Sequence, residues 1–247
     1  KKREIWVDAG IMGSPFTNET AISKDHLMYT RSFAPEYVPY YLTGVKVSAP
    51  IGKKIKAYGY ILNGWQVISD VNNPLSVGTQ IEYRPSKTVL INWDTYVGDE
   101  SSKLTPENRT RYFTDVYLIY NSTKKFSMTS CAYIGVQDKK DSLGVKSQAI
   151  WWQANAIAAY QFTKAISLAG RIEYYNDLKS VQIVPITSVK GFEAYSAGLC
   201  LNVKVGDNAF FRLEGKSFYS DRKMFIGKNK QETNWSNLLI TNLTVWF

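Results

Sequence analysis

The chain has 247 residues, enough for one large β domain or two small ones, and its aromatic content of 14%, with 17 Tyr and 7 Trp, exceeds the need of a small core. No window approaches the roughly 18 apolar residues of a membrane-spanning helix, which excludes a helical membrane protein. The net charge is +9, but the basic residues are not interleaved with aromatic side chains on which nucleotide bases could stack. We therefore expect no nucleic-acid partner.

Twelve segments alternate between apolar and polar residues with a period of two, which is the period of a β-strand with one apolar face. Each segment has about ten residues, the length that a tilted strand needs to cross a bilayer. In chain order the predicted strands are 4–12, 40–49, 55–65, 76–84, 88–97, 112–121, 126–136, 149–161, 166–175, 192–205, 209–218 and 236–247.

The connections between these segments alternate between short and long. Short turns lie at 50–54, 84–87, 121–125, 162–164 and 206–208, and long loops lie at 13–39, 66–75, 98–111, 137–148, 176–191 and 219–235. This alternation is typical of outer-membrane barrels, whose short turns face the periplasm. We therefore predict an all-β fold, in which residues 1–247 form a single antiparallel transmembrane β-barrel domain of about twelve strands in the outer membrane of a Gram-negative bacterium.

The charges within the strands fall almost entirely on one face. In the segment 88–97, for example, Trp93 and Val97 oppose Asn92 and Asp94, and the one exception in the chain is Glu193, which we place at the outer rim. A charge on the lipid face at the midplane costs roughly 2–4 kcal/mol, whereas a soluble barrel would carry its charges outside. The polar face is therefore assigned to the lumen.

Twelve charged side chains share this polar face, six basic and six acidic. They are predicted to line a water-filled, weakly selective pore. The alternative is that they form salt-bridge ladders that plug a narrow barrel, because a dozen strands leave only a modest lumen. Whether residues 13–39 fold into the lumen as a constriction stays open. The predicted pore-lining residues are Asp8, Lys46, Glu82, Arg84, Asp94, Asp115, Arg171, Glu173, Lys204, Arg212, Glu214 and Lys216.

The final segment, from Trp235 to Phe247, contains no charge and ends on an aromatic residue. It resembles the closing strand of bacterial outer-membrane barrels, in which such an ending helps the assembly machinery to recognise the barrel. On this segment alone, a strand of a soluble β domain is the alternative.

The chain contains the phrases DAGIMGSPFTNE (8–19), MYTRSFAPEYVPYYLTGVKV (28–47) and ILNGWQVISDVN (61–72). These phrases, among others, resemble the Bacteroidota outer-membrane family called putative β-barrel porin type 2. The resemblance runs nearly end to end, and it implies the fold more than the activity. Its most specific parts are the SPF loop after the first strand and the NGW…D..N pattern of the second long loop. Thr17 stands where members carry Gly, and members carry further strands before the first one here, so the full strand count can exceed twelve.

The predicted function is a porin-like channel for passive diffusion of small hydrophilic solutes or ions. The alternative is a non-conducting structural or accessory subunit of a larger outer-membrane complex. Expected partners are outer-membrane lipid, lipopolysaccharide and other outer-membrane proteins. The positive charge of the short turns fits lipid headgroups or an acidic periplasmic partner, and plain solvation of the turns is the simpler explanation.

No enzyme is expected. Acyl-transfer chemistry typically pairs a nucleophile with a histidine base, and the single histidine, His26, lies in a long loop near Ser23 and Asp25, where a solvent-exposed role is simpler. One histidine and two unclustered cysteines predict no metal or other cofactor. Cys131 and Cys200 lie on separate strands and are expected to be free and buried.

Overall fold

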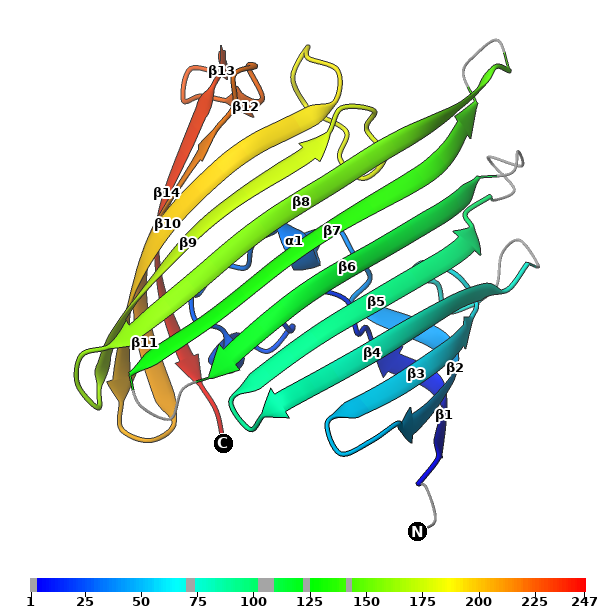
Figure 1. The fold of residues 1–247 in the computed structure, drawn as a ribbon. Helices are drawn as coiled ribbons and strands as arrows, with labels where there is room; N and C mark the ends of the chain where they lie inside the picture. Colours follow the sequence, from blue (N-terminus) through cyan, green and yellow to red (C-terminus); the bar gives the residue numbers. More distant parts are fainter. Residues whose placement is uncertain (1–3, 70–73, 102–108, 122–124, 141–143) are drawn as a thin grey trace.

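The computed structural model describes residues 4–69, 74–101, 109–121, 125–140 and 144–247 (Figure 1). One antiparallel sheet of twelve strands follows the order of the chain, each strand hydrogen-bonded to the next. The strands are β1 (Trp6–Gly13), β2 (Tyr41–Pro50), β3 (Ile55–Leu62), β4 (Ser76–Ser86), β5 (Val89–Asp99), β6 (Thr110–Asn121), β7 (Phe126–Lys140), β8 (Lys146–Gln161), β9 (Ile166–Asp177), β10 (Phe192–Val205), β11 (Ala209–Tyr219) and β14 (Trp235–Val245).

These strands confirm the twelve predicted segments and the alternation of short turns with long loops. β3 ends at Leu62 rather than at residue 65, and Gly64, just beyond its end, has a φ of 142°. β7 and β8 are longer than predicted, and their pairing continues to Lys140 opposite Lys146, beyond the apolar part of the hairpin. The last long loop contains a small hairpin of β12 (Phe225–Ile226) and β13 (Glu232–Thr233). No helix in the described part of the chain is long and apolar enough to cross a membrane.

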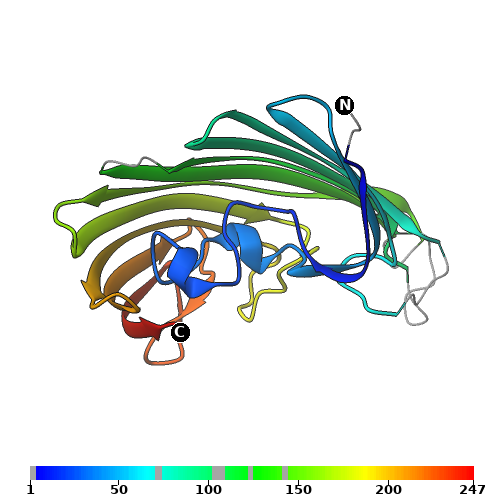
Figure 2. The same ribbon diagram turned by 90° about the horizontal axis from the view of Figure 1, so that it is seen from below.

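The sheet curves strongly, and its ends do not meet (Figure 2). Among the described residues β1 pairs with β2 alone, and β14 pairs with β11 alone, so each presents one free edge. The strands therefore form a barrel-like arc around a concave inner face.

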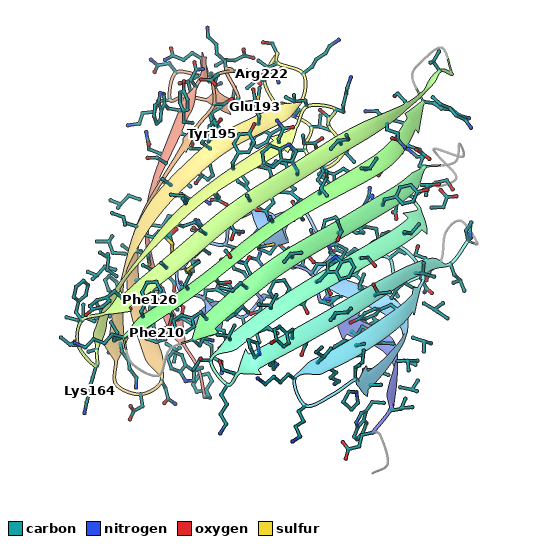
Figure 3. All side chains as sticks on the ribbon, viewed as in Figure 1. Phe126, Lys164, Glu193, Tyr195, Phe210 and Arg222 are labelled. Atoms are coloured by element: carbon teal, nitrogen blue, oxygen red, sulfur yellow. The ribbon has the colours of Figure 1, made fainter. Side chains whose placement is uncertain are left out.

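The two faces of the sheet carry the residues that the alternation assigned to them. Ile172 and Leu199 on the convex face are 66% and 61% exposed, whereas Asp94 and Glu214 on the concave face are fully buried. Glu193 lies at the long-loop end, as predicted, 3.4 Å from the Tyr174 hydroxyl (Figure 3). An apolar convex face of this extent suits a lipid environment.

Aromatic side chains gather at both ends of the convex face. At the long-loop end the ring of Tyr174 lies 4.9 Å from that of Trp152 and 4.5 Å from that of Tyr195. At the short-turn end the rings of Tyr160 and Phe162 lie 5.2 Å apart. These clusters have the positions of the aromatic girdles that flank the apolar band of membrane barrels.

The loop between β1 and β2, residues 14–40, runs along the concave face, and we call it the inserted segment (Figure 2). It contains the short 3₁₀-helix η1 (Ser23–Asp25) and the one-turn helix α1 (Phe33–Glu36). The amide of Ser14 donates to the carbonyl of Tyr40 at 3.1 Å, so the segment leaves and rejoins the sheet at one point. The question left open by the sequence is thus answered, because the first long loop lies inside the arc.

Candidate functional site

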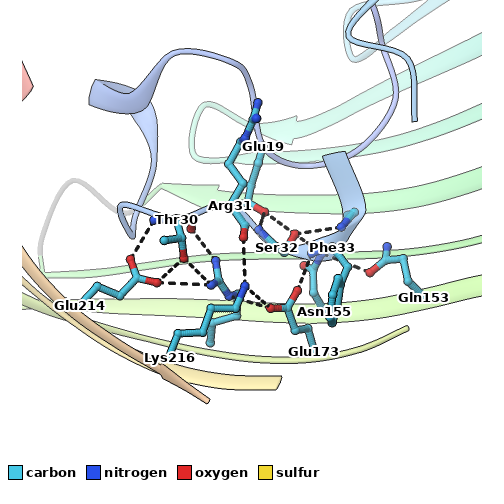
Figure 4. Close-up of polar contacts among 12 residues, drawn as sticks. Glu19, Thr30, Arg31, Ser32, Phe33, Gln153, Asn155, Glu173, Glu214 and Lys216 are labelled. Atoms are coloured by element: carbon cyan, nitrogen blue, oxygen red, sulfur yellow. Dashed lines mark hydrogen bonds and ion pairs between the residues drawn. The ribbon is translucent and has the colours of Figure 1, made fainter. Parts of the chain in front are cut away.

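Two carboxylates of the inner wall hold the middle of the inserted segment (Figure 4). Glu214 on β11 accepts hydrogen bonds from the amide of Thr30, at 2.8 Å, and from the hydroxyl of the same residue. Glu173 on β9 accepts one from the amide of Phe33 at the start of α1. A carboxylate that accepts from backbone amides forms a strong, charge-assisted bond and satisfies donors that would otherwise be buried without a partner.

Two cations balance these carboxylates. Arg171 lies 3.3 Å from Glu173 and 3.3 Å from Glu214, and its side chain is fully buried. Lys216 lies 2.9 Å from Glu173 and donates to the carbonyl of Arg31 at 3.3 Å. Pairing and hydrogen bonds of this kind offset the desolvation penalty of buried charges. The result is a network that joins β9 and β11 to the segment.

A second contact region lies nearer the short turns. Arg212 on β11 donates to the carbonyls of Ser23 and His26, at 3.0 and 3.3 Å, and to the side-chain oxygen of Asn202 at 2.9 Å. Asn202 in turn donates to the carbonyl of Leu27 at 3.0 Å. The inserted segment therefore reaches almost to the short-turn end of the arc.

Near the long loops the contacts are aromatic. Phe16 stacks on Trp65 with ring centroids 5.5 Å apart, and it meets the edge of Phe113 at 5.1 Å. The SPF and NGW motifs, which are the most specific part of the resemblance, thus contact one another. Beside them, the amide of Thr17 donates to Asp115 at 2.7 Å. Thr17 has a φ of 70°, in the region that favours glycine, which is the residue that the resemblance predicts at this position.

The predicted pore-lining residues divide into two groups. Arg171, Glu173, Arg212, Glu214, Lys216, Asp94 and Asp115 are buried on β5, β6, β9 and β11. The others are partly exposed, in pairs that join Lys46 to Asp8 at 3.1 Å, Arg84 to Glu82 at 3.5 Å and Lys204 to Asp207 at 3.0 Å. The first group thus lies mainly under or beside the inserted segment. That both groups line a conducting path remains a prediction.

Arg111 is a buried lumen residue that the sequence analysis missed. Its guanidinium lies over the rings of Trp65 and Trp151, at 4.8 and 5.4 Å, and donates to Gln137 at 2.9 Å. The predicted strand started at residue 112, and one more residue at its start would have placed Arg111 on the polar face. Asn155, which donates to the hydroxyl of Ser32 at 3.0 Å, has the right parity but no charge that would single it out.

The residues weighed for catalysis or metal binding have other contacts. The Nε2 atom of His26 lies 2.6 Å from the carbonyl oxygen of Thr20, and the Ser23 hydroxyl lies within 3.0 Å of Arg212. Cys131 and Cys200 are both free and buried, as predicted. The described residues contain no group of three or more His, Cys, Asp or Glu side chains that could hold a metal ion.

Comparison with known proteins gives a family and a similar solved structure. A family model described as "Putative beta-barrel porin-2, OmpL-like" matches residues 1–247. Among solved structures, "NanC porin structure in rhombohedral crystal form" aligns with 84% of this chain and 93% of its own, at 13% identity and a TM-score of 0.45. No curated protein matches the chain.

Proposed function

The chain belongs to the putative beta-barrel porin-2, OmpL-like family, and from this premise we propose that it is a channel in the outer membrane of a Gram-negative bacterium. Small hydrophilic solutes or ions would pass through it by passive diffusion. The family supports a porin-like channel in general, and the polar concave face of the sheet supports an aqueous path. The apolar convex face with its two aromatic rims supports a position in lipid.

The proposal rests on one observation: the inserted segment covers one part of the charged inner wall and leaves another part exposed. Around Arg171 and Glu214 the wall is bonded to the inserted segment, and both side chains are buried. On β1, β2 and β4 the charged side chains stay partly exposed, with Asp8 at 54% and Arg84 at 56%. We propose that solutes move along the uncovered part of the wall and that the inserted segment sets the width of the path.

Conduction also requires that the free edges of β1 and β14 be paired in the membrane. Lipid offers no hydrogen-bonding partner for an open edge, and each unsatisfied backbone group there costs several kcal/mol. The arc of twelve strands therefore has to be completed into a continuous wall before it can enclose water.

The test is single-channel conductance of the purified protein in a planar bilayer. A variant in which residues 15–39 are replaced by a short Gly-Ser linker should conduct more than the wild type. The linker is feasible because Ser14 and Tyr40 are hydrogen-bonded at 3.1 Å. As a matched control, the same replacement of residues 179–190, between β9 and β10, should leave the conductance within about twofold. If the folded wild type and the 15–39 variant are both silent, the channel proposal is wrong.

A non-conducting barrel is the second candidate, because the bonds from Arg171, Glu173 and Glu214 fix the segment in the lumen. In that case the protein would act as a structural or accessory subunit of a larger outer-membrane complex. Lipopolysaccharide, outer-membrane lipid and other outer-membrane proteins are the proposed partners. Silence in the bilayer, together with a partner that co-purifies in stoichiometric amount, would favour this candidate. We propose no catalytic activity for either.

A further inference from the structure

A cavity of about 320 Å³ lies between the inserted segment and the short-turn end of the inner wall. Residues 24–27 form one side, and the ends of β7 to β11, with the turn that contains Lys164, form the other. Figure 3 places Lys164 and Phe210 at this end of the arc. The volume falls at the lower end of the range of small-ligand sites, about 300–1,000 Å³.

The charge around this cavity is strongly unbalanced. Among the described residues of its lining, Asp25 is the single carboxylate, against the five cations Lys24, Lys125, Lys164, Lys204 and Arg212. Within the part of the chain that the structure describes, Lys204 alone among the five forms an ion pair, with Asp207 at 3.0 Å. The other cations leave a positive potential in a partly enclosed space, where protein walls of low dielectric focus it.

Arg212 is the fixed member of this cluster. Its side chain is buried, with the residue only 1% exposed, and its guanidinium donates to neutral acceptors on Asn202, Ser23 and His26. Arg171, the buried arginine of β9, has two carboxylates at 3.3 Å. Glu214, two residues from Arg212, is already bonded to Arg171 and Thr30. A buried cation without a carboxylate is unfavourable, and an anion in the adjoining cavity would lower that cost.

We propose that this cavity binds a small organic anion that carries a phosphate or carboxylate group. The flexible lysines supply point charges, Arg212 supplies an immobile positive charge, and Ser127, Gln161 and Ser167 offer hydrogen bonds to the rest of the solute. The inference names a solute class for the proposed channel and rests on that function for its role. The binding itself needs no conduction and is measured separately.

The experiment is calorimetric titration of the detergent-solubilised protein with inorganic phosphate and, in parallel, with acetate, while glucose serves as the uncharged control. The double variant Lys24→Gln/Lys164→Gln removes two unpaired charges of the cavity and should weaken binding about tenfold. The matched control, Lys53→Gln/Lys54→Gln, removes two lysines of the β2–β3 turn, which do not line the cavity, and should bind as the wild type does.

Weaker binding in the cavity variant alone supports the site, and the preferred anion tells a phosphate ligand from a carboxylate. Equal loss in both variants would mean diffuse surface charge, and no binding to the wild type would mean no site; either result overturns the inference. If the protein conducts but does not bind the anions, the proposed site is wrong and the channel proposal is unaffected. If the protein binds the anions but never conducts, the channel proposal is wrong and the binding site is supported.

Discussion

Replacement of Glu214 by alanine should loosen the inserted segment without unfolding the sheet. The variant loses both hydrogen bonds from Thr30 and the contact with Arg171 at 3.3 Å. Arg171 keeps Glu173 at 3.3 Å, so the substitution does not leave Arg171 without a carboxylate. The segment also keeps its bonds to Asp115 and Arg212, and we therefore expect more frequent release rather than permanent loss from the lumen.

The size of the effect follows from the two bonds to Thr30. A hydrogen bond to a charged group contributes about 1.5–3 kcal/mol, so the pair contributes about 3 kcal/mol at the lower limit. Since every 1.4 kcal/mol is a factor of ten, the ratio of released to seated segment should rise by about two orders of magnitude. Glu82→Ala is the matched control, because Glu82 is an inner-face carboxylate whose ion pair, with Arg84 at 3.5 Å, lies within β4.

Limited trypsin digestion in detergent measures the release, because cleavage after Arg31 requires the segment to leave the wall. Mass spectrometry should show faster cleavage there in Glu214→Ala than in the wild type or in Glu82→Ala. In the planar bilayer the same variant should show more frequent openings of larger conductance. Identical cleavage rates and conductance in all three proteins, with the sheet intact by circular dichroism, would refute the role given to Glu214.

Three further predictions concern the backbone and the wall. Thr17→Gly should stabilise the seated segment by about 1 kcal/mol, because relief of the roughly 1–2 kcal/mol penalty of a side chain at a φ of 70° exceeds the roughly 0.5–1 kcal/mol entropy cost of glycine; a fall in thermal stability would contradict this. Ala156→Arg places a charge on the convex face and should cost about 2–4 kcal/mol, so assembly into lipid should fail, whereas Ser147→Arg, at the long-loop end of the same strand, should assemble normally. Amide hydrogens on the free edges of β1 and β14 should exchange slowly in lipid, and fast exchange there would mean that the wall stays open.

The strands could be predicted because their signal is local. The alternation around Trp93 and Asp94 gives the strand, its length and its two faces, and the crowding of charge on one face indicates which side is polar. The same local rule failed only at strand ends, as in β3, where the alternation continues to Trp65 but the pairing stops at Leu62.

The seating of the first long loop could not be predicted in the same way. Its bonds join Thr17 to Asp115, 98 positions away, and Thr30 to Glu214, 184 positions away, and no periodicity within the loop encodes such partners. Alternation places Glu173 on the inner face but does not show what covers it. Sequence alone therefore kept the pore and the salt-bridge ladder as alternatives, whereas the structure shows a charge network that also binds backbone donors.

The inserted segment also has a consequence for the order of folding. Its contacts join early residues to late ones, and Ser23 meets Thr244 across a sequence separation of 221 residues. Such non-local contacts form slowly, because closing a long loop costs entropy before any contact is gained. The segment precedes its partners on β9, β11 and β14 in the chain. Until the strands that carry Glu173 and Glu214 are in place, the amides of Thr30 and Phe33 have no carboxylate to which they can donate. Seating of the segment would then be the final kinetic step, and a slow phase sensitive to Glu214 would mark it.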